Sequence, residues 1–243
     1  MSGRFTSEQL KKIAMGTMFI DHAAVAIVYG CGLNTWSPLA ANIGLAMRLV
    51  GRMAFPLYAF MLVQGFMWTR DWKKYLLRVV LFALVSEIPF NLALSNKIWY
   101  SNTQNTLLTL TVSLVCLKML DALEKKYDGE EGKFLRIVLN VWVIVGAMTI
   151  TALFRSDGGA FGLLLVVLFY FFRHRPAEQA AAGCAGLLLI YGFSLSVLFA
   201  WIAIFFISRY NGERGRKMGL LPYIFYPAHL LAVWLAGWLI SGI

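Results

Sequence analysis

Six ionisable side chains stand inside long apolar stretches of the sequence and are the candidates for chemistry. They are His22, Asp21, Glu87, Arg48, Arg52 and His229. An ionisable group at membrane depth is costly unless it faces a partner or a cavity, so such groups commonly mark functional sites. His22 stands next to a carboxylate, and a carboxylate that orients an imidazole is the usual support of a general base. The pattern therefore predicts acid–base or nucleophilic chemistry centred on His22.

The two carboxylates admit more than one arrangement. Adjacent residues on a helix point about 100° apart, so Asp21 faces either His22 or one of the arginines, and in the second case the orienting role falls to Glu87. Arg48 and Arg52 are i,i+4 neighbours on one helix face, and either can position an anionic acceptor or stabilise a tetrahedral oxyanion. In the alternative interpretation, the carboxylates only neutralise the arginines in a structural ion-pair network, and the histidines only pack.

A second candidate site is a connection rich in glycine and basic residues late in the chain, residues 208–217. An Asn-Gly turn there is accompanied by four Lys and Arg residues. Glycine lets a backbone approach a ligand closely, and arginine and lysine suit phosphate groups. The alternative is a turn whose basic residues only set the membrane topology.

The elements that must position these groups are membrane-spanning helices. Of the 243 residues, 60% are hydrophobic and 14% are charged, against about 25% charged in an ordinary soluble protein. A spanning helix needs about 20 apolar residues, which leaves no room for a soluble domain beside the spans. We expect an all-α, polytopic helical bundle that forms one domain over residues 1–243. The charge-poor stretches predict nine spans, at residues 10–30, 47–68, 75–94, 105–122, 134–154, 158–172, 178–192, 195–208 and 220–241.

The placement of basic residues predicts the orientation of the bundle. The net charge is +10, but the basic residues form short runs between apolar segments, which argues against nucleic acid as a partner. With the N-terminus inside, 18 of the 22 Lys and Arg residues fall in inner segments, and the outer connections hold only Lys97 and Arg155. Cytoplasmic connections carry an excess of Lys and Arg, so we expect the N-terminus inside and the C-terminus outside. Gly192 and the serines near it are the expected turn between spans seven and eight.

The three cysteines are expected to pack rather than to react. Cys31, Cys116 and Cys184 lie in apolar runs or at their ends, and they have none of the close spacings typical of metal sites or disulfide frameworks. No metal is therefore expected.

Several short motifs follow one another in a definite order along the chain. They are Leu10-Lys11-Lys12-Ile13-Ala14 leading to Ile20-Asp21-His22, Arg48-Leu49-Val50-Gly51-Arg52-Met53-Ala54-Phe55-Pro56, Ser86-Glu87-Ile88-Pro89-Phe90-Asn91, Asp157-Gly158-Gly159-Ala160-Phe161-Gly162, Tyr210-Asn211-Gly212 and Phe225-Tyr226-Pro227-Ala228-His229-Leu230. This order resembles the TraX family over nearly the whole chain. The family's namesake is similar to a membrane acetyltransferase that caps the N-terminus of a conjugative pilin subunit, with acetyl-CoA as donor. More distantly, the chain resembles a larger group of transmembrane acyltransferases in which a membrane histidine is implicated in acyl transfer.

The resemblance implies a multi-pass acetyltransferase of the cell (plasma or inner) membrane. The implicated histidine falls on His22, as central base or as transient carrier of the acetyl group. The phosphates of cytosolic acetyl-CoA are expected at the inner basic segments, chiefly at Tyr210, Asn211, Arg214, Arg216 and Lys217, with Lys73 and Lys74 as a second contribution. The expected partners are membrane lipid, acetyl-CoA and an amine or hydroxyl acceptor on a peptide or glycan. Nothing in the sequence indicates a conjugation system, so the acceptor stays open.

Two other classes of function remain open. A proton-coupled transporter would use Asp21, His22 and Glu87 as a relay and would show flux without consuming acetyl-CoA. A scaffold without enzymatic activity would leave the buried charges no task beyond pairing.

Overall fold

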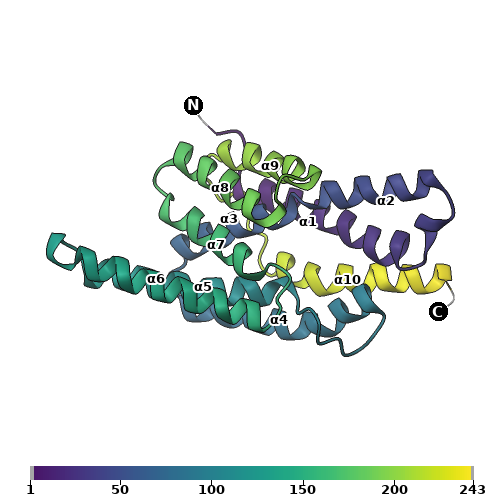
Figure 1. The fold of residues 1–243 in the computed structure, drawn as a ribbon, viewed down its shortest axis with the longest axis horizontal. Coiled ribbons are helices and arrows are strands. Elements are labelled where there is room, and N and C mark those ends of the chain that lie inside the picture. Colours follow the sequence, from purple (N-terminus) through teal and green to yellow (C-terminus); the bar gives the residue numbers. More distant parts are fainter. Residues whose placement is uncertain (1–2, 242–243) are drawn as a thin grey trace.

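A computed structural model describes residues 3–241, and these residues fold into α-helices joined by short connections (Figure 1). A π-helical turn, η1 (Ala24–Tyr29), and a short 3₁₀ turn, η2 (Leu33–Thr35), lie between the first two α-helices. The α-helices are α1 (Ser7–Ala23), α2 (Pro38–Gly51), α3 (Ala54–Trp68), α4 (Trp72–Ser95), α5 (Thr106–Lys126), α6 (Glu130–Leu153), α7 (Gly159–Phe171), α8 (Pro176–Tyr191), α9 (Leu195–Ser208) and α10 (Leu221–Ser241). The prediction of an all-α fold is confirmed.

Every predicted span contains a helix. Six helical segments are long and apolar enough to cross a membrane: Ser7–Tyr29, Pro38–Trp68, Trp72–Ser95, Thr106–Lys126, Glu130–Leu153 and Leu221–Ser241. Two further apolar helices, α7 and α9, are shorter. The chain is thus a polytopic helical membrane protein, as the composition predicted.

The predicted start of the second span, at residue 47, is wrong. The helix begins at Pro38, because the side chain of Ser37 accepts a hydrogen bond from the backbone N–H of Ala40 (3.2 Å) and proline is favoured at the first helical position. The helical segment is then interrupted at Arg52 and Met53, which separate α2 from α3.

The predicted turn between spans seven and eight is confirmed. Gly192 follows α8 with a φ of +61°, a left-handed conformation that glycine adopts without steric cost. Ser194 precedes the first turn of α9.

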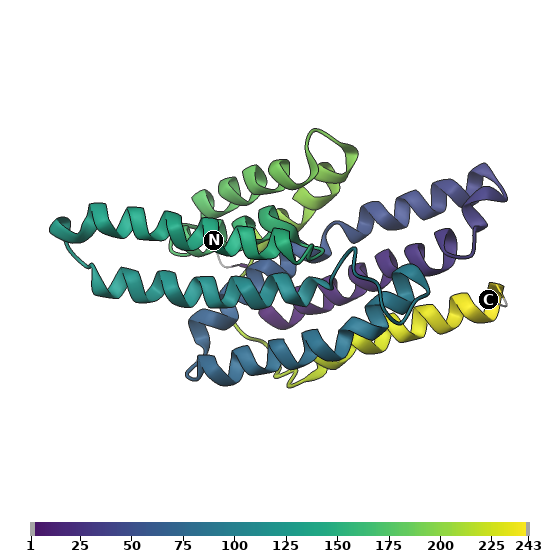
Figure 2. The same cartoon turned by 60° about the horizontal axis from the view of Figure 1, so that its bottom comes forward.

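Backbone hydrogen bonds tie together two groups of connections. In one group, the segment before α1 runs beside the α9–α10 connection, where the N–H of Phe5 donates to the carbonyl of Arg209 (3.0 Å). In the other group, the α4–α5 and α6–α7 connections meet, where the N–H of Gln104 donates to the carbonyl of Arg155 (3.1 Å). The charge pattern assigns these groups to the inner and outer sides respectively. In both views the α5–α6 turn and the end of α10 lie at opposite extremes of the elongated molecule (Figures 1 and 2).

The side of the membrane on which each group lies stays a prediction. The C-terminus is expected to lie outside the cytoplasm, because 18 of the 22 basic residues belong to segments assigned to the inner side. A reporter enzyme that is active only outside the cytoplasm is therefore expected to be active when it is fused there. Alkaline phosphatase and green fluorescent protein fusions measure this, with fusions in the α5–α6 turn as the internal comparison. A fluorescent, phosphatase-negative C-terminus would contradict the predicted orientation.

Two apolar clusters support the region between them. The larger draws mainly on α3, α5, α7 and α9 and includes Leu110, whereas the smaller draws mainly on α1, α4 and α10 and includes Met18 and Tyr226; α1, α3 and α4 contribute residues to both. These three side chains also line one cavity. The cavity therefore lies where the two clusters meet.

Candidate active site

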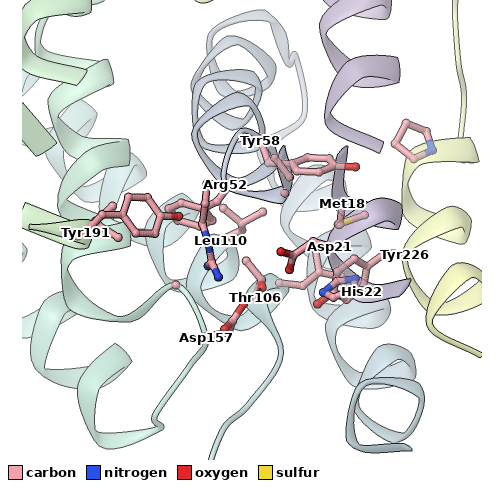
Figure 3. A pocket seen from close by; sticks show the side chains of 17 residues that line it. Met18, Asp21, His22, Arg52, Tyr58, Thr106, Leu110, Asp157, Tyr191 and Tyr226 are labelled. Atoms are coloured by element: carbon pink, nitrogen blue, oxygen red, sulfur yellow. Dashed lines mark hydrogen bonds between the residues drawn. The ribbon is translucent and has the colours of Figure 1, made fainter. Parts of the chain in front are cut away.

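The cavity between the clusters has a volume of about 170 Å³ and is partly open. The end of α2, helices α1, α3, α5, α8 and α10, and the α6–α7 connection contribute to it. Its polar lining residues are Asp21, His22, Arg52, Tyr58, Thr106, Asp157, Tyr191 and Tyr226. Arg52 and Tyr191 lie on one side, and Asp21, His22 and Tyr226 lie on the other (Figure 3).

Four buried polar atoms on this cavity have no hydrogen-bond partner among residues 3–241. They are Asp21 Oδ1, Arg52 Nε, Tyr58 Oη and Tyr226 Oη. Buried polar atoms are nearly always hydrogen-bonded, and each exception calls for an explanation such as a ligand or water. One cavity that gathers a carboxylate acceptor, a guanidinium donor and two phenols is therefore suited to a polar ligand.

Asp21 forms an ion pair with an arginine. This is one of the two arrangements that the sequence left open. Asp21 Oδ2 accepts a hydrogen bond from the guanidinium of Arg48 at 2.5 Å, and both side chains are mostly buried. Gly51 allows this approach, because a Cβ at that position would overlap the Asp21 side chain. The second carboxylate oxygen, Oδ1, is left for the cavity.

The two arginines have different surroundings. Arg48 is neutralised by Asp21, whereas Arg52 has no ion-pair partner among residues 3–241. The guanidinium carbon of Arg52 lies 5.6 Å from the centre of the Tyr191 ring, a cation–π distance, and Arg52 Nε has no hydrogen-bond partner among the described residues. The break between α2 and α3 places Arg52 on the cavity wall, so Arg52 is the cation available to a ligand.

His22 pairs with the other membrane histidine. His22 Nδ1 lies 2.7 Å from His229 Nε2, and His229 Nδ1 lies 2.8 Å from the carbonyl oxygen of Phe225. Both histidines are buried, and His22 also lines the cavity. The structure thus brings His22 and His229 into direct contact although they are 207 residues apart in the chain.

The expectation that a carboxylate orients His22 is corrected by this geometry. Glu87 Oε2 accepts hydrogen bonds from the side chain (2.5 Å) and the backbone N–H (3.3 Å) of Asn105, the N-cap of α5. Glu87 does not line the cavity. Because Asp21 turns toward Arg48 and Glu87 turns toward the start of α5, neither carboxylate hydrogen-bonds His22.

The basic connection after α9 is held against the start of α1. The N–H groups of Ser7 and Glu8 donate to the carbonyls of Glu213 (2.9 Å) and Arg214 (3.1 Å). In return, Glu8 Oε2 accepts from the backbone N–H of Arg216 (2.7 Å). This pairing fixes the backbone of the connection.

The predicted phosphate-binding residues of this connection differ in exposure. Arg214, Arg216 and Lys217 are exposed, and the guanidinium of Arg214 lies over the ring of Trp68 at 5.7 Å. Tyr210 instead packs its ring against Phe60, with ring centres 5.4 Å apart, and burial raises the pKa of Tyr210 to about 12. The three basic side chains are therefore accessible to an anion, whereas Tyr210 anchors the connection.

The remaining predicted phosphate-binding residues are polar and lie close to the surface. Asn211 bonds within its own turn, because its side chain accepts from the N–H of Glu213 (2.9 Å). Lys73 and Lys74 are exposed at the start of α4, and Lys74 pairs with Asp71 at 3.4 Å. None of them lines the cavity.

Comparison with known proteins shows to which family the chain belongs. The family model described as "TraX protein" matches residues 6–236. The chain belongs to the TraX family. It is also similar to a protein of Dichelobacter nodosus named "Probable fimbrial assembly protein FimC, serogroup H1", with 27% identity and 93% of each chain covered. No solved structure gives a significant match.

The TraX-family chain places further residues on the cavity that were not among the predicted site residues. They are Tyr58, Thr106, Asp157, Tyr191 and Tyr226. Thr106 Oγ1 donates to Asp157 Oδ2 at 2.6 Å, which joins the start of α5 to the α6–α7 connection. Asp157 and Tyr226 stand in two of the motifs that carry the family resemblance, so the sequence did offer a signal for these two site residues. Tyr58, Thr106 and Tyr191 gave none, because they look like ordinary residues of helix interiors and helix ends.

Proposed function

We propose that this member of the TraX family is a membrane acetyltransferase that moves an acetyl group from cytosolic acetyl-CoA to an amine or hydroxyl. The observation that carries the proposal is the cavity: His22 shares it with four buried polar atoms that have no partner among the described residues. A base next to unpaired hydrogen-bond donors is an arrangement suited to acyl transfer.

The proposed reaction uses these groups as follows. The proton of the acceptor's N–H or O–H bond moves to His22 as the electron pair of the acceptor forms a bond to the thioester carbonyl carbon. The carbon–sulfur bond then breaks, its electron pair leaves with sulfur, and the proton held by His22 moves to the CoA thiolate. In a second route, a nitrogen of His22 bonds to the thioester carbon and the carbon–sulfur bond breaks with its electron pair on sulfur. The electron pair of the acceptor then bonds to the same carbon, the carbon–nitrogen bond breaks with its pair returning to His22, and the acceptor's proton goes to the CoA thiolate. Arg52 donates to the oxyanion that forms in between.

The donor would reach the cavity from the basic connection. Pro222 lines the cavity and follows Lys217 by five residues, so their Cα atoms lie no more than about 18 Å apart. Phosphates bound at Arg214, Arg216 and Lys217 would thus leave the thioester arm a short distance to cover.

The acceptor and the location belong to the proposal as well. The relative from Dichelobacter nodosus is named as a fimbrial assembly protein, which favours a pilus subunit or another surface component as acceptor. We place the protein in the inner membrane, with the acceptor reaching the cavity from the outer side.

Binding of acetyl-CoA by the purified protein in detergent tests the proposal. Changing Arg214, Arg216 and Lys217 together to Gln is expected to raise the Kd at least about tenfold, because a charged hydrogen bond contributes about 1.5–3 kcal/mol before solvent screening. Isothermal titration calorimetry measures this, and the matched control is a triple Gln variant of Lys125, Lys126 and Lys133. These control side chains are also exposed, and their loss removes the same charge from the helix ends on either side of the α5–α6 turn.

Two results would contradict the proposal. An unchanged Kd in the first triple variant would leave the connection as a topological signal only. Wild-type protein that neither binds nor hydrolyses acetyl-CoA, but moves protons or solutes in liposomes, would indicate the transporter instead.

A further inference from the structure

The geometry points to His229 as a positioning residue that fixes the protonation pattern of His22 and makes Nε2 of His22 the reacting atom. The inference rests on the proposed acetyl transfer for its catalytic meaning. Its structural content, the position of the protons on two rings, stands on the hydrogen bonds alone and is testable without turnover.

The directions of the hydrogen bonds follow from the chain of contacts. A carbonyl oxygen only accepts, so at 2.8 Å from Phe225 the Nδ1 atom of His229 must carry a proton and donate it. In a neutral ring the other nitrogen then carries a lone pair, so Nε2 of His229 accepts. Nδ1 of His22, 2.7 Å away, must therefore be the donor. The backbone carbonyl thus sets the protons on both rings.

The packing around His229 holds this chain of contacts in place. The planes of the two imidazoles differ by 23° with centres 5.0 Å apart, so the N–H of one ring points close to the plane of the other, where the lone pair lies. The Phe225 ring stacks on His229 at 4.7 Å with an interplanar angle of 9°. His229 is 3% exposed, which leaves its ring little freedom to turn.

The consequence for His22 is a defined reacting atom. Its Nδ1 is occupied by His229, and no residue among 3–241 hydrogen-bonds its Nε2. Since His22 lines the cavity, the lone pair on Nε2 is the one offered to the acceptor. It takes the proton of the acceptor and later returns it to sulfur, while His229 keeps its own protons throughout. This is the role that a carboxylate plays for histidine in hydrolytic triads, performed here by a second imidazole.

Nitrogen-15 NMR of ¹⁵N-histidine-labelled protein in detergent tests the pattern directly. The chain has three histidines, so single His→Gln variants assign every ring signal. At a pH where the rings are neutral, His22 and His229 are both expected to show a protonated Nδ1 and an unprotonated Nε2. A His22 ring with its proton on Nε2 would overturn the inference, whether or not the protein transfers acetyl groups.

Kinetics of acetyl transfer give the second test. His229→Ala is expected to lower kcat about 10²-fold with little change in the KM for acetyl-CoA, because the base remains but its ring is no longer held. His229→Gln is expected to recover part of the loss, since its side-chain carbonyl can accept from His22 Nδ1. His174→Ala, at an exposed position, is the control and should leave kcat unchanged. Full activity in a folded His229→Ala protein would overturn the inference while leaving the proposed function intact.

Discussion

A His22→Gln protein is expected to insert and to bind acetyl-CoA normally, but to transfer acetyl groups about 10²- to 10⁴-fold more slowly than the wild type, or more slowly still if His22 carries the acetyl group. We expect this result because the reaction and the binding of acetyl-CoA are assigned to different residues. His22 lines the cavity, whereas the basic residues proposed to bind the phosphates lie on the connection after α9 and do not line it. Glutamine keeps a polar group of similar size but offers no basic nitrogen.

The measurement is release of CoA thiol in the presence of an amine or hydroxyl acceptor, together with the Kd of acetyl-CoA for each variant. His174→Gln provides the control, because this histidine is exposed between α7 and α8. If His22 variants kept near-normal turnover while His229 variants were inactive, the central base would belong to α10 and not to α1.

The second large expected effect is that substitutions of Arg48 and of Arg52 have different consequences. Arg48→Gln is expected to destabilise the folded protein by about 3–5 kcal/mol, because it leaves the buried carboxylate of Asp21 without its partner. Removing both charges in an Asp21→Asn/Arg48→Gln protein is expected to restore most of that stability, since two neutral amides can hydrogen-bond in the same place. Thermal unfolding in detergent, followed by circular dichroism, measures both.

Arg52→Gln is expected to behave in the opposite way. Arg52 has no ion-pair partner among the described residues, so its loss should leave the thermal unfolding midpoint nearly unchanged and lower the rate of acetyl transfer about 10²- to 10³-fold, the typical contribution of an oxyanion donor. Arg52→Lys, which keeps the charge, is the matched control. Loss of folding with Arg52→Gln, or full activity, would show that Arg52 serves packing and not the reaction.

The helical architecture was predictable because local properties decide it. Charge-poor stretches of about 20 residues specify helices in lipid, where every backbone group must be bonded within its own segment. The same locality made the turn at Gly192 predictable from one glycine and its serines. The prediction from hydropathy failed at the start of α2, because the helix begins at Pro38 with a cap at Ser37.

The set of candidate residues was also largely visible in the sequence, because ionisable groups stand out in apolar segments. His22, Asp21 and Arg52 line the cavity, and Arg48 and His229 contact its lining residues directly. Glu87 was chosen on the same criterion, yet it bonds to Asn105. Composition therefore identified the groups without identifying their partners.

Only the tertiary structure decided which group meets which. Pairing depends on how each helix is rotated about its axis and how closely it approaches its neighbour, and hydropathy is insensitive to both. The close contact of α1 with α2 is allowed by the absence of a side chain at Gly51, where Asp21 meets Arg48. The contact of α1 with α10 joins His22 to His229 across 207 residues of chain. Such contacts arise from packing between distant segments, so the sequence determined the chemical groups and the fold determined their chemistry.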